Sequence, residues 1–161
     1  MEAISAPWRM AYIGGTKAEG CVLCREDNTC ENYMLRDGKH AFVLMNLYPY
    51  TTGHLMVAPT RHVGILEELR SEERTAIFDL VVFAVEALKR AIKPDGFNIG
   101  VNLGHAAGAG IEEHLHIHIV PRWNGDTNFM SVVGDVRVIP EDITKTRDKL
   151  LPYFKDVTRG E

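Results

Sequence analysis

The sequence lacks the features that would mark a membrane, secreted or nucleic-acid-binding protein. None of its apolar runs approaches the roughly 20 residues that a membrane span requires. The segment Met1–Trp8 has no basic start followed by an apolar core, so it does not resemble a secretory signal. Lysine and arginine residues are scattered, and the net charge of −4 gives no general attraction for nucleic acid. We therefore expect a cytoplasmic protein without membrane or nucleic-acid partners, which must hold any anionic ligand with local groups.

Cysteine is also scarce. The chain has three cysteines, an odd number that cannot all pair within one chain. A reducing compartment also disfavours a disulfide framework. Cys21 and Cys24 have the C-x-x-C spacing, and Cys30 follows nearby. This pattern favours a metal site or free thiols over disulfide bonds.

Nothing in the chain requires a second domain. Its 161 residues, 45% of them hydrophobic, suffice for one compact core, and repeats and low-complexity tracts are absent. The expected strands and helices are segregated, without the alternation typical of a parallel sheet, which predicts an α+β fold. Residues 1–20, which contain Pro7 and three glycines, are interpreted as an irregular N-terminal arm, and residues 124–161 as a C-terminal extension.

Turn residues and periodicity locate the expected elements. Asp37-Gly38 lies between two β-prone runs and predicts a hairpin. Ser71, followed by two acidic residues, is expected to cap a long helix that Pro94 ends. Strands are expected at residues 32–36, 40–46, 54–58, 97–102, 114–120 and 132–139, and a terminal helix at residues 141–151.

Three histidines form the most informative pattern in the chain. His114, His116 and His118 alternate with aliphatic residues, so a strand would place them together on the face opposite the core. Imidazole serves as base, acid, nucleophile or metal ligand near neutral pH. Three in register indicate chemistry, either catalysis or a metal site.

The segment upstream of the histidines favours a phosphate ligand. Gly104, Gly108 and Gly110 fall within seven residues, after Asn102. Glycines permit positive φ and close backbone approach, so their N–H groups can form an anion-binding nest. An ordinary flexible loop would have the same composition, but its place beside three histidines indicates phosphate.

These residues resemble the signature of a known family. The run from His114 to Arg122 is similar to the motif of the histidine triad (HIT) superfamily of nucleotidyl hydrolases and transferases. Asn46, Gly53-His54-Leu55 and Pro59-x-x-His62 resemble the family's earlier strand pair, and the likeness covers roughly residues 20–123. It implies a single HIT-like domain over residues 1–161, with an antiparallel sheet of about five strands, one long helix and a C-terminal helix.

The resemblance also implies a role for each site histidine. His116, in the middle of the triad, would attack the α-phosphorus and form a nucleotidyl-histidine intermediate. His118 and His54 would contact the phosphate oxygens, while the main chain at His114 would orient the attacking ring. No organic cofactor is implied.

Substrate-binding residues follow from the same resemblance. Asn46 would contact the ribose hydroxyls and Asn102 the phosphate side. Many family members have Gly-Gln-(Ser/Thr) just before the triad, but here Gly110-Ile111 takes that place and the loop is one residue longer. Backbone donors of Gly108, Ala109 and Gly110 would then replace the missing side chains.

The glycine-loop sequence, with Trp123 after Pro-Arg, is most like one branch of the superfamily. That branch contains the dinucleoside polyphosphate hydrolases and the bacterial diadenosine tetraphosphate phosphorylases, and Trp123 is expected to bind substrate. Three functions remain open: a hydrolase of dinucleoside polyphosphates or related nucleotide conjugates, a phosphorolytic adenylyltransferase, and a nucleotide-binding regulatory module with incidental phosphoramidase activity.

Zinc and a second copy of the chain are the remaining expected partners. Zinc-bearing members of the resembled family use positions that correspond to Cys21, Cys24, His62 and His114, which predicts one structural zinc with Cys₂His₂ ligation. Free reduced thiols are the alternative. Because the family is typically two-fold and the long helix offers apolar surface, we also expect a homodimer.

Overall fold

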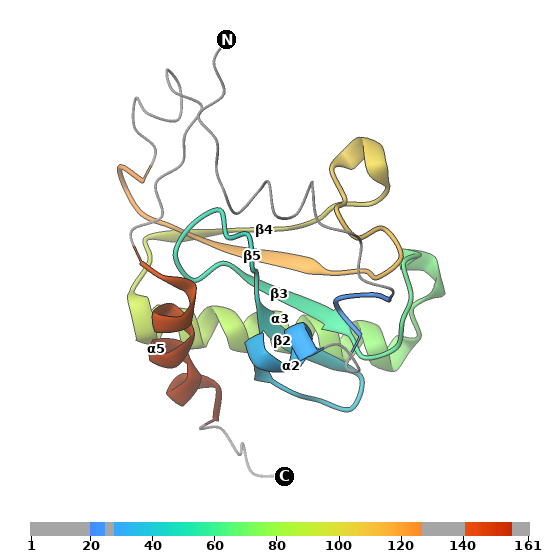
Figure 1. The fold of residues 1–161 in the computed structure, drawn as a ribbon, viewed down its shortest axis with the longest axis horizontal. Coiled ribbons are helices and arrows are strands. Elements are labelled where there is room, and N and C mark those ends of the chain that lie inside the picture. The colour runs from blue at the N-terminus through green and yellow to red at the C-terminus, as the bar shows by residue number, and fades with distance from the viewer. Residues whose placement is uncertain (1–19, 25–27, 127–140, 156–161) are drawn as a thin grey trace.

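The computed structural model describes residues 20–24, 28–126 and 141–155. Within these ranges the chain forms one five-stranded sheet in the order β1-β2-β3-β5-β4, in which every neighbouring pair is antiparallel (Figure 1). The strands are β1 (Met34–Arg36), β2 (Ala41–Met45), β3 (Leu55–Pro59), β4 (Gly96–Val101) and β5 (Ile117–Arg122). The α+β prediction with about five antiparallel strands is confirmed.

Helices connect and cover the strands. The described helices are α2 (Asn28–Tyr33), α3 (Ser71–Ile92) and α5 (Ile143–Lys155), with short 3-10 helices η1 (Leu66–Glu68) and η2 (His105–Ala107). The long helix α3 runs along the sheet, and α5 lies at one end of it (Figure 1). No helix in the described ranges combines the length and apolarity needed to cross a membrane.

The two central strands are buried on both faces. Every residue of β2 and β3 is buried, because α3 covers one face of the sheet and α2 with its preceding turn covers part of the other. The core beneath α3 includes Val43, Val57 and Ile119, packed against helix residues at helical spacing: Ile77, Val81, Ala84 and Leu88. The second cluster contains Leu23, Phe42 and Met56. Among the described residues, this second cluster covers β2 and β3 and includes no residue of β4 or β5.

The predicted hairpin is present, but its first strand is shorter than expected. The Gly38 N–H donates to the Asp37 carboxylate at 2.9 Å, and a Cβ on Gly38 would lie 2.5 Å from the Ala41 carbonyl oxygen. Strand β1 begins at Met34 rather than residue 32, because the preceding residues form α2. The apolar pattern of this short segment fits either element, and the burial of Cys30 in the second cluster favours the helix.

Helix α3 begins at Ser71, the residue expected to cap it, and thus one residue earlier than predicted. Arg70, not Ser71, is the N-cap, and its backbone N–H donates to the Glu73 carboxylate at 2.8 Å. Glu73 also accepts two hydrogen bonds from Arg61, which lower the pKa of this buried carboxyl to about 2. The bidentate pair fastens the segment after β3 to the start of α3, which fixes the chain next to His62.

Two further boundaries differ from the sequence prediction. Strand β5 begins at Ile117 instead of His114, since the Leu115 N–H donates to the Val63 carbonyl outside the sheet ladder. Helix α5 begins at Ile143 because the Asp142 carboxylate accepts from the next backbone N–H groups, and it continues past Pro152 to bury Phe154 against α3. The strand predicted at residues 132–139 and the arm at residues 1–19 lie outside the described residues.

Candidate active site and metal centre

The histidine site lies on the face of the sheet opposite α3. His118 of β5 pairs across the ladder with Met56 of β3 and Gly100 of β4, so these residues share that face. His54 immediately precedes β3, and Gly53 before it has φ +76°, where a Cβ would lie 2.7 Å from the Ile92 side chain. The turn that delivers His54 to the site therefore requires glycine.

His116 is held in one tautomer by the backbone. Its Nδ1 lies 2.8 Å from the His114 carbonyl oxygen, and the side chain is only 6% exposed. A carbonyl oxygen can only accept, so Nδ1 carries the proton and Nε2 keeps its lone pair. In the neutral ring, the nitrogen free to act as a nucleophile is therefore Nε2.

His54 and His118 are ordered by a chain of hydrogen bonds. The Tyr50 backbone N–H donates to His54 Nδ1 at 3.0 Å, so the proton of the His54 ring is on Nε2. His54 Nε2 lies 3.0 Å from His118 Nδ1 and donates to it. His118 therefore carries its own proton on Nε2, where it can serve a ligand as a donor.

Burial keeps His118 neutral. Loss of solvation lowers the pKa of this imidazole to about 4, and the neighbouring His116 ring, with its centroid 4.9 Å away, contributes in the same direction. Protonation would place two N–H groups against each other between His54 and His118. The hydrogen-bonded chain exists only while His118 is neutral.

Asn46 lies at the edge of this chain. Its Oδ1 accepts from the Tyr48 backbone N–H at 2.9 Å, and its Nδ2 lies 3.4 Å and 3.3 Å from the two nitrogens of His54. The structure thus brings Asn46 together with His54, His116 and His118. This is the grouping that the sequence predicted.

The glycine-rich loop follows β4 and has the expected conformation. Gly104 and Gly108 have φ of +78° and +85°, and the Asn102 side chain lies 3.5 Å from the Gly108 carbonyl. The N–H groups of Gly108 and Ala109 donate to carbonyls of residues 105 and 104 within the loop. A phosphate-binding role for these two donors therefore requires the loop to rearrange.

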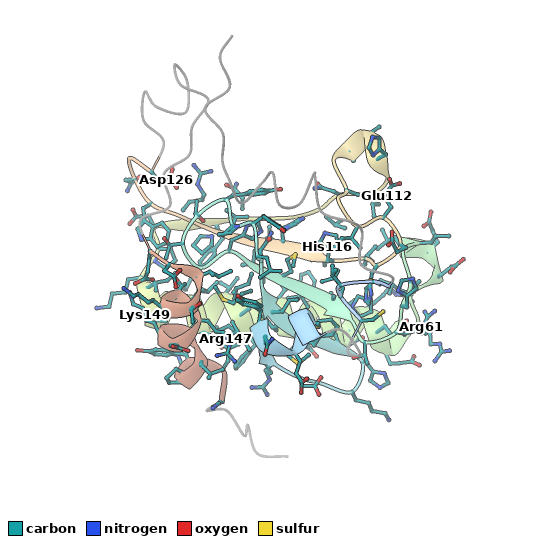
Figure 2. The ribbon with its side chains drawn as sticks, in the orientation of Figure 1. Arg61, Glu112, His116, Asp126, Arg147 and Lys149 are labelled. Atoms are coloured by element: carbon teal, nitrogen blue, oxygen red, sulfur yellow. The ribbon has the colours of Figure 1, made fainter. Side chains whose placement is uncertain are left out.

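Trp123 lies away from the histidines. It follows the far end of β5, five positions after His118, which corresponds to roughly 16 Å along an extended chain. Figure 2 places His116 and Asp126 toward opposite ends of this strand. Asp126 holds the turn by accepting from Arg122 and from the Trp123 N–H.

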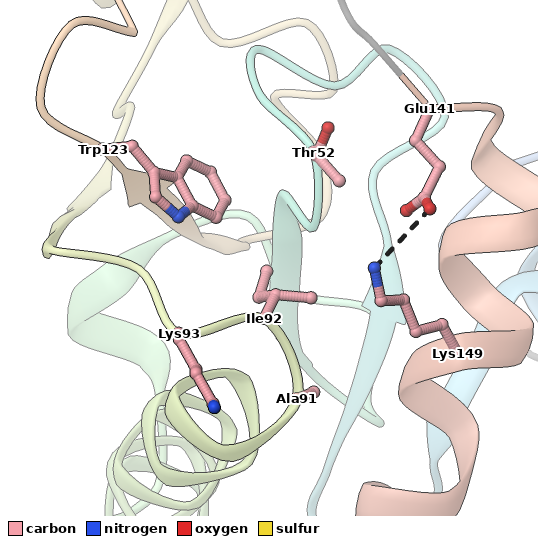
Figure 3. Close-up of a pocket in the computed structure, with 7 residues that line it drawn as sticks. All are labelled: Thr52, Ala91, Ile92, Lys93, Trp123, Glu141 and Lys149. Atoms are coloured by element: carbon pink, nitrogen blue, oxygen red, sulfur yellow. Dashed lines mark ion pairs between the residues drawn. The ribbon is translucent and has the colours of Figure 1, made fainter.

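A cleft of about 500 Å³ lies beside Trp123 (Figure 3). It is lined by Thr52, Ala91, Ile92, Lys93, Trp123, Glu141 and Lys149. Thr52 Oγ1 is buried and has no hydrogen-bond partner among the described residues. The loop of residues 47–53 thus has the histidine site on one side, at Tyr50, and this cleft on the other.

A second cluster brings together Cys21, Cys24, His62 and His114. Their candidate ligand atoms all lie within 4.8 Å of one another. His114 Nε2 lies 2.8 Å from the Pro59 carbonyl, so Nε2 carries the proton and the lone pair of Nδ1 faces the sulfurs, 3.4 Å from Cys21 Sγ. Two thiolates and two neutral imidazoles, one oriented by a backbone carbonyl, form a donor set that fits tetrahedral zinc.

His114 consequently has two functions in the architecture. Its ring belongs to the cysteine cluster, edge-on to His62, while its carbonyl orients His116. Burial lowers the pKa of the His114 imidazole, which favours the neutral form that a metal ligand needs. The family resemblance implied both assignments of His114, and the structure places its ring in one group and its carbonyl in the other.

Tyr50 is the site residue that the sequence did not single out. Its ring centroid lies 4.6 Å from that of His54 and 6.0 Å from that of His118. The available signal was an aromatic residue four positions before His54, inside a segment that Pro49 and Gly53 mark as a turn. Turn composition alone does not indicate which way such a ring points.

Comparison with known proteins identifies relatives of this arrangement. A family model described as "HIT domain" matches residues 29–125. A protein named AP-4-A phosphorylase from Mycobacterium tuberculosis (strain CDC 1551 / Oshkosh) is 44% identical over 117 residues, which is 73% of this chain and 60% of that protein. The chain thus spans less than two thirds of the length of this relative.

Two further matches are relevant. A bis(5'-nucleosyl)-tetraphosphatase (asymmetrical) from Schizosaccharomyces pombe is 33% identical over 88 residues, covering 55% of this chain and 48% of that protein. The crystal structure of a Zn-bound histidine triad family protein from Mycobacterium smegmatis superposes with a TM-score of 0.63 at 26% identity, over 76% of this chain and 83% of that one.

Proposed function

Because this chain belongs to the HIT domain family, we propose that it is an enzyme that cleaves nucleotides at the α-phosphorus, with His116 as its nucleophile. The observation that carries the proposal is the hydrogen bond from His116 Nδ1 to the His114 carbonyl, which leaves Nε2 free to attack. His118 supplies an N–H donor beside it.

The reaction consists of two displacements. Nε2 of His116 forms a bond to the α-phosphorus while the bond to the bridging oxygen breaks, and the electron pair leaves on the departing phosphate. His118 Nε2–H donates a hydrogen bond to that oxygen as negative charge develops. An acceptor then attacks the phosphorus, the P–N bond breaks, and its electron pair returns to His116. A water acceptor releases one proton to solvent in this step, whereas a phosphate anion attacks through an oxygen that carries no proton.

Dinucleoside polyphosphates are the proposed substrates. The names of two relatives, a phosphorylase and a tetraphosphatase, both support this class. Asn46 binds the ribose hydroxyls, and Asn102 faces the phosphate chain. The loop of Gly108, Ala109 and Gly110 joins Asn102 there once the Gly108 and Ala109 N–H groups leave their contacts within the loop. Trp123 is too far along β5 to reach the reacting phosphorus, so its contact is with a distal part of a long substrate.

The acceptor distinguishes hydrolysis from phosphorolysis. Water gives a nucleoside monophosphate, whereas inorganic phosphate gives a nucleoside diphosphate. The 44% identity to a protein named as a phosphorylase favours phosphate as acceptor, and the nucleotidyl hydrolase is the alternative. A regulatory module with incidental phosphoramidase activity would not need the fixed nucleophilic tautomer of His116.

A substrate panel tests the proposal. Dinucleoside polyphosphates of different chain length and nucleoside phosphoramidates are incubated with and without inorganic phosphate, and products are resolved by mass. We expect a nucleoside diphosphate that forms only with phosphate present. Nucleoside monophosphate formed equally in both conditions would assign hydrolysis, and no product from any substrate would reject the enzyme.

We also propose a structural zinc in the cluster of Cys21, Cys24, His62 and His114. The donor set and the orientation of His114 support it, as does the Zn-bound relative. Bound zinc would add folding free energy by linking the turn before α2 to the segment that leads into β5. It would thereby also steady the His114 carbonyl that orients His116.

A homodimer is the proposed assembly. Helix α3 exposes Phe78 (68%) and Val82 (49%) one turn apart, and Ile99 (49% exposed) lies on the edge strand β4. Ile99 pairs with the core residue Ile119, so it faces the same side of the sheet as α3. Light scattering should give twice the chain mass of 18.1 kDa, and a mass near 18.1 kDa at micromolar concentration would contradict the dimer.

A further inference from the structure

Tyr50 covers the hydrogen bond between His54 and His118. Its ring is tilted 45° to His54 and 29° to His118, with centroid distances of 4.6 Å and 6.0 Å. Tyr50 is 43% exposed, whereas His54 is fully buried. The ring therefore lies between solvent and the histidine pair, in contact with both.

The same residue also fixes the proton positions. The Tyr50 backbone N–H is a donor only, so His54 Nδ1 must accept, and the His54 proton is directed to His118. Within the described part of the chain, five residues face His118: His116 just before β5, His54 before β3, Tyr50 on the loop, and Met56 and Gly100 across the ladder. None of these carries a fixed charge that would hold His118 in place.

We propose that Tyr50 is a positioning residue, whose ring packs against His54 and His118 so that His118 presents Nε2–H to the leaving oxygen. The inference rests on the proposed function. It assigns to Tyr50 no contact with the reacting atoms. Without the ring, water reaches the pair, His118 becomes easier to protonate, and its donor is no longer directed at one point.

Leaving-group dependence separates this role from a purely structural one. Aryl esters of a nucleoside 5′-monophosphate provide a series in which only the basicity of the departing phenol changes. A 4-nitrophenolate leaves without assistance, whereas unsubstituted phenolate needs a donor on its oxygen. Tyr50→Ala should therefore lower kcat by no more than about threefold for the nitrophenyl ester and by about tenfold or more for the phenyl ester.

Two matched variants serve as controls. Tyr50→Phe keeps the ring and should follow wild type across the series. Tyr48→Ala removes an aromatic ring from the same loop and should lower kcat by the same factor for every ester. If Tyr50→Ala also lowers kcat by the same factor for every ester, the ring has no positioning role and the proposal is wrong.

A spectroscopic readout does not depend on turnover. Imidazole ¹⁵N–¹H NMR should show His118 protonated on Nε2 alone in wild type and Tyr50→Phe. Tyr50→Ala keeps the backbone N–H that sets the tautomer, so we expect His118 to stay protonated on Nε2 but with a higher pKa, closer to 6.5. An unchanged His118 pKa in Tyr50→Ala overturns the inference, even if wild type turns over. A raised His118 pKa in a protein without turnover sustains the positioning role and rejects the proposed function instead.

Discussion

The depressed pKa of His118 predicts a specific loss of stability in mild acid. An unfolded histidine titrates near 6.5, whereas the folded His118 titrates at about 4. Between these values the unfolded chain binds more protons than the folded chain, so the free energy of unfolding falls as pH falls. Integrating the two titration curves from pH 7 to pH 5 gives a loss of about 2 kcal/mol from this residue alone.

Urea unfolding measures this loss. The free energy of unfolding is determined at pH 7, 6 and 5 for wild type and for His118→Gln, which does not titrate. Other acid-sensitive groups, including the zinc ligands, contribute equally to both proteins and cancel in the difference. Wild type should lose about 2 kcal/mol more than His118→Gln between pH 7 and pH 5. Parallel losses in the two proteins would refute the account of a half-buried, neutral His118.

Two further variants probe the space around the site and the metal. Gly100 lies opposite His118, and an added Cβ there would have nothing within 4 Å. Gly100→Val should therefore fill the ligand space and raise the nucleotide Kd, measured by calorimetric titration, about tenfold. Gly96 is equally open at the other end of β4, so Gly96→Val should leave the Kd unchanged. Cys24→Ser should reduce zinc measured by elemental analysis well below one per chain and lower Tm, whereas Cys30→Ser, which lies in the second core cluster, should keep the metal.

Features that depend on local chemistry could be predicted from the sequence. Asp37-Gly38 directs a hairpin through its own turn preference, and Gly53 permits the positive φ that delivers His54 to the site. The alternation of His116 and His118 with aliphatic residues likewise fixes their face. These signals lie within a few residues of the structure that they determine.

Features that depend on distant partners could not be predicted in the same way. Ser71 has the better capping side chain, but Arg61 holds Glu73 where it accepts from Arg70, so the helix begins one residue earlier. The packing of the loop of residues 47–53 decides two further positions. It places Tyr50 over His118, and it lines the cleft where Trp123 lies beside the end of α3. Each case is decided by contacts across more than ten residues of chain.

The central claim is covalent catalysis by His116, and trapping of the intermediate tests it most directly. Wild-type protein is mixed with a dinucleoside polyphosphate labelled at the α-phosphate, quenched, and analysed for label on the protein. We expect acid-labile, base-stable label on wild type and none on His116→Asn, which should still bind nucleotide through Asn46 and the loop after β4. Loss of the nucleophile should raise the barrier by about 4 kcal/mol or more, at 1.36 kcal/mol per tenfold in rate. Turnover of His116→Asn within tenfold of wild type, or unlabelled wild-type protein during turnover, would contradict the account.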